Sequence, residues 1–360
     1  MTDDLFSDAV AQLLIDQCTP AVVRAIEAGG DHRSLWQHIE SAGFADALLP
    51  EDKGGAGMGL ADVYPIWALC GAHALPVPLA ETMLCRALLA ATGLTAPKGS
   101  LTLATGTLNA QGTLTCDTVR CGRVADHVLA VLPDRLLVLP TAQATATDAG
   151  FCLDATLQWP AADVAAAPSA PDTLDVRTLQ SCLYSAQLAG ALMSVFQRTL
   201  AYANDRNQFG RPIGKFQAIQ HQLSVMAEHV FAARMAAQLG CHSDQGIQLN
   251  RQRVAVAKAR TSEAALEVAS LAHSIHGAIG FTAEFDLQLY TRRLHLWRQA
   301  AGSETYWHGV LGAALLDAPD TSTLDLIRRI TDTAYRRRPG VLLGRQCQRH
   351  AALLQSGHQA

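Results

Sequence analysis

The sequence predicts an α+β fold that is mainly α-helical. Two observations carry this prediction. Apolar residues recur at helical spacing in the first and last parts of the chain, and between these parts they alternate with threonine in short runs, as half-buried strands do. We therefore expect an N-terminal helical domain, a middle β domain and a C-terminal four-helix bundle.

Residues 1–97 form the predicted N-terminal helical domain. Val10 and Leu14 have the i, i+4 spacing of one helix face, and similar pairs follow along this part of the chain. The pattern is interrupted at residues 54–55, which are both glycine, and at residues 76–78, which read Pro-Val-Pro. Several helices are expected, with breaks at these two points.

Residues 98–162 form the predicted middle β domain, which is short. Its strand signals are runs such as residues 101–105 and 135–139, where Leu, Val and Thr dominate. Residues 161–175 are rich in Ala, Pro and Ser, and we interpret them as a linker to the next domain.

Residues 176–317 form the predicted C-terminal helical bundle, and residues 318–360 a C-terminal helical extension. Four segments of the bundle place apolar side chains on one helix face. The extension is rich in arginine, which indicates either a solvated basic face or a contact with another subunit. The faces are marked by Leu188, Leu192, Val195 and Thr199, by Ile219, Leu223, Met226 and Val230, by Ala264, Val268, Leu271 and Ile275, and by Tyr306, Val310 and Ala314; the arginines are Arg328, Arg329, Arg336, Arg337, Arg338, Arg345 and Arg349.

Composition narrows the class of protein. The 360 residues are 49% hydrophobic and 17% charged, enough to bury more than one core. A net charge of -4 gives no electrostatic reason to expect nucleic acid. The acidic start lacks the basic region of a signal peptide, and no uninterrupted apolar run approaches about 18 residues. We expect a cytoplasmic protein without a membrane segment.

The cysteines indicate reduced thiols rather than a metal centre. All nine are dispersed, no pair has Cys-x-x-Cys spacing, and no Cys/His cluster has the spacing of a metal site, so no metal is expected. Cys116 and Cys121, in a predicted strand pair, leave a disulfide open as an alternative.

The most informative segment is residues 205–220, which read Asp-Arg-Asn-Gln-Phe-Gly-Arg-Pro-Ile-Gly-Lys-Phe-Gln-Ala-Ile-Gln. We call it the cofactor corner, because it joins two amphipathic helices through a Gly/Pro bend. The forked guanidinium of arginine can bind phosphate, and amide side chains can hydrogen-bond to the edge of a base. The corner is therefore suited to a nucleotide cofactor. The alternative is a polar turn with an exposed arginine.

Three motifs in sequence order resemble those of acyl-CoA dehydrogenases, FAD-dependent enzymes that form an α,β double bond in acyl-CoA thioesters. Residues 206–220 resemble the family's Arg-x-x-Phe-Gly…Phe-Gln-x-x-Gln, residues 276–284 its His-Gly-Gly-x-Gly-Phe-Thr-x-Glu, and residues 50–57 its Pro-Glu-x-x-Gly-Gly-x-Gly. The resemblance covers about residues 35–317. It implies FAD as cofactor, an acyl-CoA substrate, electron-transfer flavoprotein as a partner and an oligomeric state.

The resemblance also implies that the cofactor corner reaches across a subunit interface to the FAD of a neighbouring chain. Two features depart from the family pattern. Ala278 replaces the second glycine of the middle motif, and residues 103–109 lack a full Pro-Gly-x-Gly-Ser flavin loop. The residues that the resemblance assigns to the cofactor are Arg206, Gln208, Phe209, Phe216, Gln217, Gln220, His276, Gly277, Ser303 and Thr305.

The catalytic base of the family is missing from its usual place. In these enzymes a carboxylate removes the α-proton of the acyl-CoA, and the turn that usually carries it places Ala301 at that position. A second known position falls on Gln180, and neither side chain accepts a proton. Glu304 is the candidate catalytic base if the loop is remodelled. Alternatively, Ser303 caps the last helix and Glu304 is stabilised by the helix dipole.

Two main classes of function follow, with a third kept open. The first is an FAD-dependent acyl-CoA dehydrogenase that uses Glu304 or a weaker candidate, Asp175 or His308. The second is a catalytically impaired partner subunit that completes the FAD site of a base-bearing chain in a hetero-oligomer. Family members acting on bulky CoA thioesters pair unlike chains in this way, so a role in lipid or steroid catabolism is expected, and the arginine-rich extension becomes a candidate contact for CoA phosphates. The third class is a CoA-thioester binder without flavin.

Overall fold

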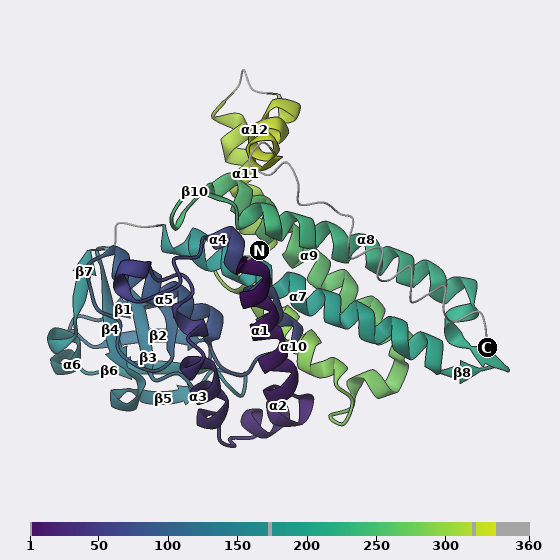
Figure 1. Cartoon of the computed structure of the whole chain (residues 1–360), viewed down its shortest axis with the longest axis horizontal. Coiled ribbons are helices and arrows are strands. Elements are labelled where there is room, and N and C mark those ends of the chain that lie inside the picture. The colour runs from purple at the N-terminus through teal and green to yellow at the C-terminus, as the bar shows by residue number, and fades with distance from the viewer. Residues whose placement is uncertain (1, 172–174, 319–321, 336–360) are drawn as a thin grey trace. The chain divides into compact units, whose positions relative to one another are not determined.

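The computed structural model describes residues 2–171, 175–318 and 322–335, and the predicted α+β, mainly helical class is confirmed (Figure 1). Helices come first, a sheet follows, and long helices come last, in the predicted order. The N-terminal helices are α1 (Thr2–Gln17), α2 (Pro20–Glu27), α3 (Arg33–Ser41), α4 (Leu60–Ala72) and α5 (Leu79–Ala91), with the 3-10 turns η1 (Phe44–Asp46) and η2 (Glu51–Lys53).

Both breaks predicted in the N-terminal part are confirmed. Residues 54–55 lie between η2 and α4, and residues 76–78 lie between α4 and α5. Gly55 is required by close packing, because a Cβ there would lie 2.1 Å from the Leu49 carbonyl oxygen.

The N-terminal helices pack directly onto the bundle through a contact between α4 and α7 (Val176–Asp205). A Cβ at Gly71 would lie 1.9 Å from the Gln187 carbonyl oxygen, and one at Gly190 would lie 1.8 Å from that of Ala68. Glycine on each helix therefore brings the two backbones together. Gly190 therefore allows close packing of α7 against α4.

The middle domain is one sheet in the order β5-β6-β2-β1-β3-β4-β7. Its neighbouring strands are antiparallel except β1 and β3, which run parallel. Buried apolar side chains alternate with exposed ones along β2 and β6, as predicted for half-buried strands. The strands are β1 (Leu101–Leu108), β2 (Leu114–Val119), β3 (His127–Val131), β4 (Arg135–Pro140), β5 (Thr145–Asp148), β6 (Ala155–Trp159) and β7 (Ser169–Pro171).

The interpretation of residues 161–175 as a linker is wrong for its first part. Residues 161–166 form the helix α6 (Ala161–Ala166), and β7 pairs with the end of the sheet through Ala170 and Leu136. The sheet therefore extends past residue 162. The sequence carries no strand signal for β7, because the strand is only three residues long and Ala170 is its one buried side chain. Alanine and proline are both uncommon in strands.

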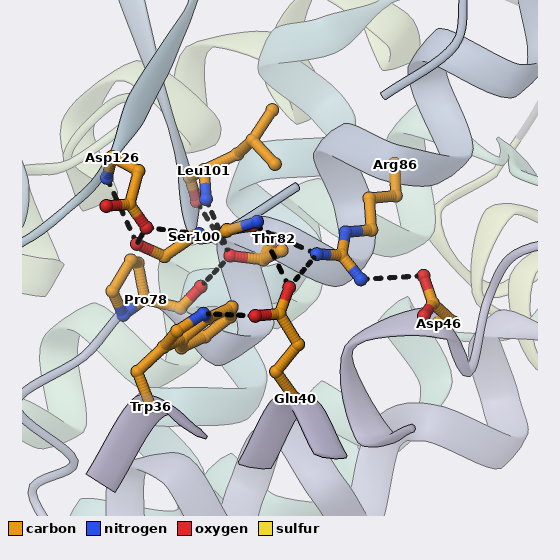
Figure 2. A network of polar contacts seen from close by, with 10 residues as sticks. Trp36, Glu40, Asp46, Pro78, Thr82, Arg86, Ser100, Leu101 and Asp126 are labelled. Carbon is orange, nitrogen blue, oxygen red and sulfur yellow. Dashed lines mark hydrogen bonds and ion pairs between the residues drawn. The ribbon is translucent and has the colours of Figure 1, made fainter. Parts of the chain in front are cut away.

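A polar network anchored by Arg86 joins three parts of the N-terminal domain to the sheet (Figure 2). The Arg86 guanidinium, on α5, bonds Glu40 of α3 and Asp46 of η1, each at 2.8 Å, and the Gly99 carbonyl oxygen at 2.9 Å. Its side chain is only 7% exposed. Beside it, Thr82 of α5 exchanges hydrogen bonds with the backbone of Leu101, the first residue of β1.

Replacing Arg86 by methionine is expected to lower the free energy of unfolding by about 2–3 kcal/mol, because two carboxylates lose their buried cation. The Arg328→Met control removes an exposed pair with Asp325 and should change it by less than about 0.5 kcal/mol. Urea unfolding measures both values. Equal stability of the two variants would show that the network contributes nothing beyond a surface pair.

The C-terminal helical part comprises α7 and four further helices, of which α8, α9 and α10 pack against α7. The four apolar faces predicted from the sequence fall on α7, α8, α9 and α11, and the shorter α10 packs against α7 and α9. These helices are α8 (Gln217–Gly240), α9 (Arg251–His276), α10 (Leu287–Gln299) and α11 (Glu304–Leu316); the connections hold β8 (Asn207–Gln208), β9 (Arg211–Pro212), η4 (Ile213–Lys215), β10 (Ser243–Gln245), β11 (Gln248–Leu249) and η5 (Gly277–Phe281).

The predicted extension is described in part, as α12 (Thr323–Tyr335), which carries Arg328 and Arg329. The other five arginines of that prediction lie outside the described residues. Within the described residues no single helix has both the length and the apolar character of a membrane span; only α1 and α2, taken together as a bent pair, meet those criteria.

Candidate active site and cofactor corner

A cavity of about 780 Å³ lies between the sheet and the bundle. Its walls come from β1, the end of β2, the connection between β3 and β4, the first turns of α7, and the turn that precedes α11. A cavity of this size suits a small ligand or part of a larger one.

The two positions at which the family carries its base meet on the wall of this cavity. Ala301 lies in the turn before α11 and Gln180 on α7, and both line the cavity. Next to Gln180, the Ser181 hydroxyl donates to the Ala301 carbonyl oxygen at 2.9 Å, and Gln180 itself donates to the Leu103 carbonyl oxygen at 3.2 Å. Both candidate base positions therefore face one space, and neither presents a carboxylate.

Glu304, the candidate base from the sequence, is turned toward another partner. Its carboxylate forms an ion pair with Arg298, and it is not among the residues that line the cavity. Its second oxygen, Oε2, is buried and has no hydrogen-bond partner among the described residues. The neighbouring Ser303 accepts a backbone hydrogen bond from Trp307 at 3.2 Å, and Thr305 is exposed on α11.

A buried lysine holds the turn that carries Ala301. The Lys258 ammonium group, on α9, donates to the carbonyl oxygens of Arg298 at 2.7 Å and Gly302 at 3.0 Å, and to the Ser262 hydroxyl at 3.0 Å. These three acceptors match its three N–H bonds. Burial lowers the pKa of Lys258 to about 7, although the charge of Glu304 opposes this effect. Sequence analysis missed this residue.

The entrance of the cavity carries a polar cluster around Tyr306. Arg251 donates to the Tyr306 hydroxyl at 2.7 Å and to Asp175 at 2.5 Å. Asp175 caps α7 by accepting the Thr178 N–H at 3.1 Å. Burial alone would raise the pKa of Asp175, but hydrogen bonds from Thr178 and Arg251 outweigh it and hold this pKa below its usual value.

The two weaker base candidates therefore both have partners. Asp175 lines the cavity but is engaged by the α7 N-terminus and Arg251. His308 is half exposed and pairs with Glu263 at 2.8 Å, outside the cavity lining.

The cofactor corner forms a hairpin at the far end of α7. Residues Asn207–Gln208 pair with Arg211–Pro212 through a tight turn at Phe209 and Gly210, whose φ angles are 53° and 80°. Positive φ at both central positions is typical of two-residue hairpins. The Phe209 ring is 91% exposed and meets the Phe216 ring edge-on at 6.1 Å.

The second predicted cofactor motif lies beside this corner. His276 ends α9, and its ring stacks on Tyr202 of α7 with centroids 4.3 Å apart. Gly277 follows with a φ of 64°, where α9 ends and η5 begins. Gln217 and Gln220 lie at the start of α8, and both are exposed.

The predicted cofactor residues thus fall into two sets at opposite ends of α7. One set, the corner with His276 and Gly277, lies near Arg206 at its C-terminus. The other set, Ser303 and Thr305, follows Ala301, whose carbonyl oxygen bonds Ser181 in the second turn of α7, next to Gln180. About 26 residues of helix at 1.5 Å each separate them by roughly 39 Å. Figure 1 shows the sheet at one end of α7 and β8 at the other. The corner cannot reach the cavity of its own chain.

The corner is chemically suited to the group that the family binds. Within the described residues, the Arg206 side chain has no hydrogen-bond or ion-pair partner, and it is exposed. The buried Nε2 of His276 also has none. A free guanidinium beside an exposed ring and several amides offers the donors that a pyrophosphate and an aromatic base require.

Comparison with known proteins places these features in one family. The sequence profile of "Acyl-CoA dehydrogenase, C-terminal domain" matches residues 181–316. Acyl-CoA dehydrogenase IpdE2 of Mycobacterium tuberculosis is 32% identical over 296 residues, which span 81% of this chain and 90% of that protein. The counterpart from Mycolicibacterium smegmatis is 32% identical over 303 residues, with 83% and 94% covered.

Solved structures share the fold. A chain of the ChsE4–ChsE5 complex from Mycobacterium tuberculosis superposes with a TM-score of 0.75 at 23% identity, covering 89% of this chain and 98% of that one. A glutaryl-coenzyme A dehydrogenase bound to glutaryl-CoA gives 0.70 at 18%, covering 88% and 95%. The N-terminal helices, the sheet and the C-terminal helices thus form the fold of these solved structures. This chain belongs to the acyl-CoA dehydrogenase family, whose members are FAD-binding flavoproteins.

Proposed function

We propose that this chain is a subunit of an FAD-dependent acyl-CoA dehydrogenase and that its cofactor corner completes an FAD site in another family chain. The observation that carries the proposal is the separation of the two cofactor sets by roughly 39 Å of α7. Since the corner cannot reach its own cavity, FAD would be held between two chains. The exposed Phe209, and the Arg206 side chain with no partner in the part of the chain that the structure describes, support the same arrangement.

Arg206 would bind the pyrophosphate, Gln208, Gln217 and Gln220 would offer amides, and Phe209 and Phe216 would cover an aromatic ring. When bound, FAD accepts the hydride that leaves the β-carbon of the acyl-CoA. Electron-transfer flavoprotein is the proposed partner that reoxidises the assembly. The acyl group is proposed to be bulky, because the structurally similar Tcur3481–Tcur3483 protein is a steroid acyl-CoA dehydrogenase, and the similar ChsE4–ChsE5 complex supports a hetero-oligomer.

We further propose that the proton is removed in the other chain. Proton transfer requires a base within about 3 Å of the α-carbon proton or one water away. Here the cavity wall presents Ala301 and Gln180, and Glu304 pairs with Arg298. A base-bearing family chain would supply the carboxylate, in a hetero-oligomer.

A second candidate function, a dehydrogenase that uses Glu304 as its own base, is favoured by the environment of one Glu304 oxygen. Glu304 Oε2 is buried without a partner among the described residues, which is costly for a carboxylate and typical of a functional group. If the turn before α11 moves, Glu304 would be the base of a self-sufficient dehydrogenase. His308 and Asp175 have partners and are not favoured.

Turnover of Glu304→Gln separates the two candidates. We expect the variant, assembled with a base-bearing family chain, to keep its rate within about threefold, because the proposed base lies elsewhere. A loss of about 10²–10⁴ would instead identify Glu304 as the base. Ala301→Glu is the matched gain-of-function variant: it should create dehydrogenation in this chain only if FAD already lies beside its cavity. Both are measured by flavin bleaching with acyl-CoA.

A further inference from the structure

The hydroxyl of Tyr184 is a polar group whose partner is missing. Tyr184 is on α7, its side chain is 0% exposed, and it lines the cavity. Among the described residues nothing accepts from or donates to its Oη. Buried hydroxyls are nearly always hydrogen-bonded, and one that is not marks a place where a ligand or water completes the site.

Tyr184 lies at the inner end of the cavity. Along one face of α7, Arg177 is exposed, Gln180 is half-buried and Tyr184 is fully buried, and all three line the cavity. These positions follow one another by turns of the helix. Leu103 and Leu132, which also line the cavity, are 2% and 3% exposed. The Tyr184 hydroxyl is thus a donor at a buried end of the cavity whose walls include apolar side chains.

The charges around Tyr184 balance one another. Arg120 also lines the cavity, but it forms an ion pair with Asp154, whose side chain is 2% exposed. Burial raises the pKa of Glu81, on α5, to about 7. Arg120 is thus already paired with Asp154, and Glu81 is a further acidic group beside Tyr184. An anionic ligand would therefore meet no unpaired cation among the described residues at this end of the cavity. Burial also raises the pKa of Tyr184 well above its usual value, so it remains a donor.

We propose that the inner end of the cavity binds a neutral oxygen acceptor, such as a ketone, on the acyl part of a CoA thioester, with the Tyr184 hydroxyl donating to it. The CoA portion rests on the proposed function. Its phosphates are strongly hydrated and must stay at the entrance near Arg177, so the oxygen that meets Tyr184 belongs to the far end of the acyl group. The site therefore selects oxygenated acyl groups over plain alkyl chains.

Calorimetric titration of the chain in its assembly tests the proposal with three kinds of thioester of equal length. These are octanoyl-CoA, a set of oxo-octanoyl-CoA isomers with the ketone near the chain end, and the dicarboxylic suberyl-CoA. We expect at least one oxo isomer to bind about tenfold more tightly than octanoyl-CoA, the effect of one hydrogen bond. Suberyl-CoA should bind no better than octanoyl-CoA. In Tyr184→Phe the oxo preference should vanish while octanoyl-CoA binds unchanged.

The thermal midpoint of ligand-free Tyr184→Phe provides an independent readout. It should equal or exceed that of the wild type, because the variant loses a buried hydroxyl that has no partner. Tyr64→Phe is the matched control: Tyr64 donates to the Arg234 carbonyl oxygen at 3.4 Å, is not among the residues lining the cavity, and should keep the oxo preference.

Several results would overturn the proposal. These are equal binding of all oxo isomers and octanoyl-CoA, tightest binding of suberyl-CoA, a preference that survives in Tyr184→Phe, or an equal loss of every thioester in that variant. A Tyr184→Phe midpoint well below the wild type would mean that the hydroxyl already has a partner. Titration needs no turnover, so an inactive protein that keeps the oxo preference contradicts only the proposed function. Failure of every thioester to bind contradicts both.

Discussion

Replacing Lys258 by methionine is expected to lower the free energy of unfolding by about 3–5 kcal/mol. The side chain is 0% exposed, and its three acceptors include the carbonyl oxygens of Arg298 and Gly302. Without the ammonium the Gly302 oxygen loses its Lys258 donor, and the Arg298 oxygen keeps only the longer bond from the Ser262 hydroxyl, at 3.3 Å. Ser262→Ala removes a hydroxyl that accepts from Lys258 and donates to the Arg298 carbonyl oxygen, and it should cost about 1 kcal/mol. Urea unfolding compares the two, and equal losses would contradict a central role for Lys258.

The stabilities of the wild type and of Lys258→Met should depend differently on pH. The Lys258 pKa is about 7 in the fold and 10.5 in the unfolded chain, so between these values the unfolded chain binds the extra proton. Stability of the wild type relative to Lys258→Met should therefore rise from about pH 7 toward 10.5, by up to about 1.4 kcal/mol per pH unit. Below pH 7 the difference should be flat. A difference that falls above pH 7 would contradict burial as the dominant influence.

The second large effect concerns the cofactor corner. Arg206→Ala, in the chain assembled with its base-bearing partner, is expected to weaken FAD about ten- to a hundredfold, because a charge-assisted contact contributes about 1.5–3 kcal/mol. Gln217→Ala should give a smaller loss. The dissociation constant is obtained by titrating apoprotein with FAD and following flavin fluorescence.

Two controls make the Arg206 result specific. Arg206→Lys keeps the charge but loses the planar fork, so its affinity should fall between wild type and alanine. Lys215→Ala removes an exposed charge from the same corner and should leave the affinity within about twofold. Equal losses of FAD affinity in Lys215→Ala and Arg206→Ala would show that the corner contributes only its overall positive charge.

Local signals explain what could be predicted from the sequence. The breaks at residues 54–55 and 76–78, the bend within residues 205–220 and the helix faces each depend on neighbours in the chain, and glycine, proline and periodicity indicate them directly. The resemblance assigned Ala301 and Gln180 to the two base positions, and the structure brings both to the wall of one cavity.

Distant contacts explain what could not. The Arg120–Asp154 pair joins the end of β2 to the start of the neighbouring β6, which are distant in the sequence, and two acceptors of Lys258 come from the far end of α10 and the turn after it. Tyr184 had a usable signal, because it lies one helical turn beyond Gln180 on the same face. For Glu304 the sequence signal was misleading. Its position near Ala301 in the sequence favoured a base, but its pairing with Arg298 depends on how the turn folds.

The central claim, that FAD lies between this chain and another, is tested most directly by sedimentation velocity followed at the flavin absorbance band. The chain alone has a mass of 38.3 kDa. We predict that flavin sediments only with larger species that contain the base-bearing chain, and that Arg206→Ala in this chain releases it. A stable, flavin-loaded species at 38.3 kDa would contradict the account.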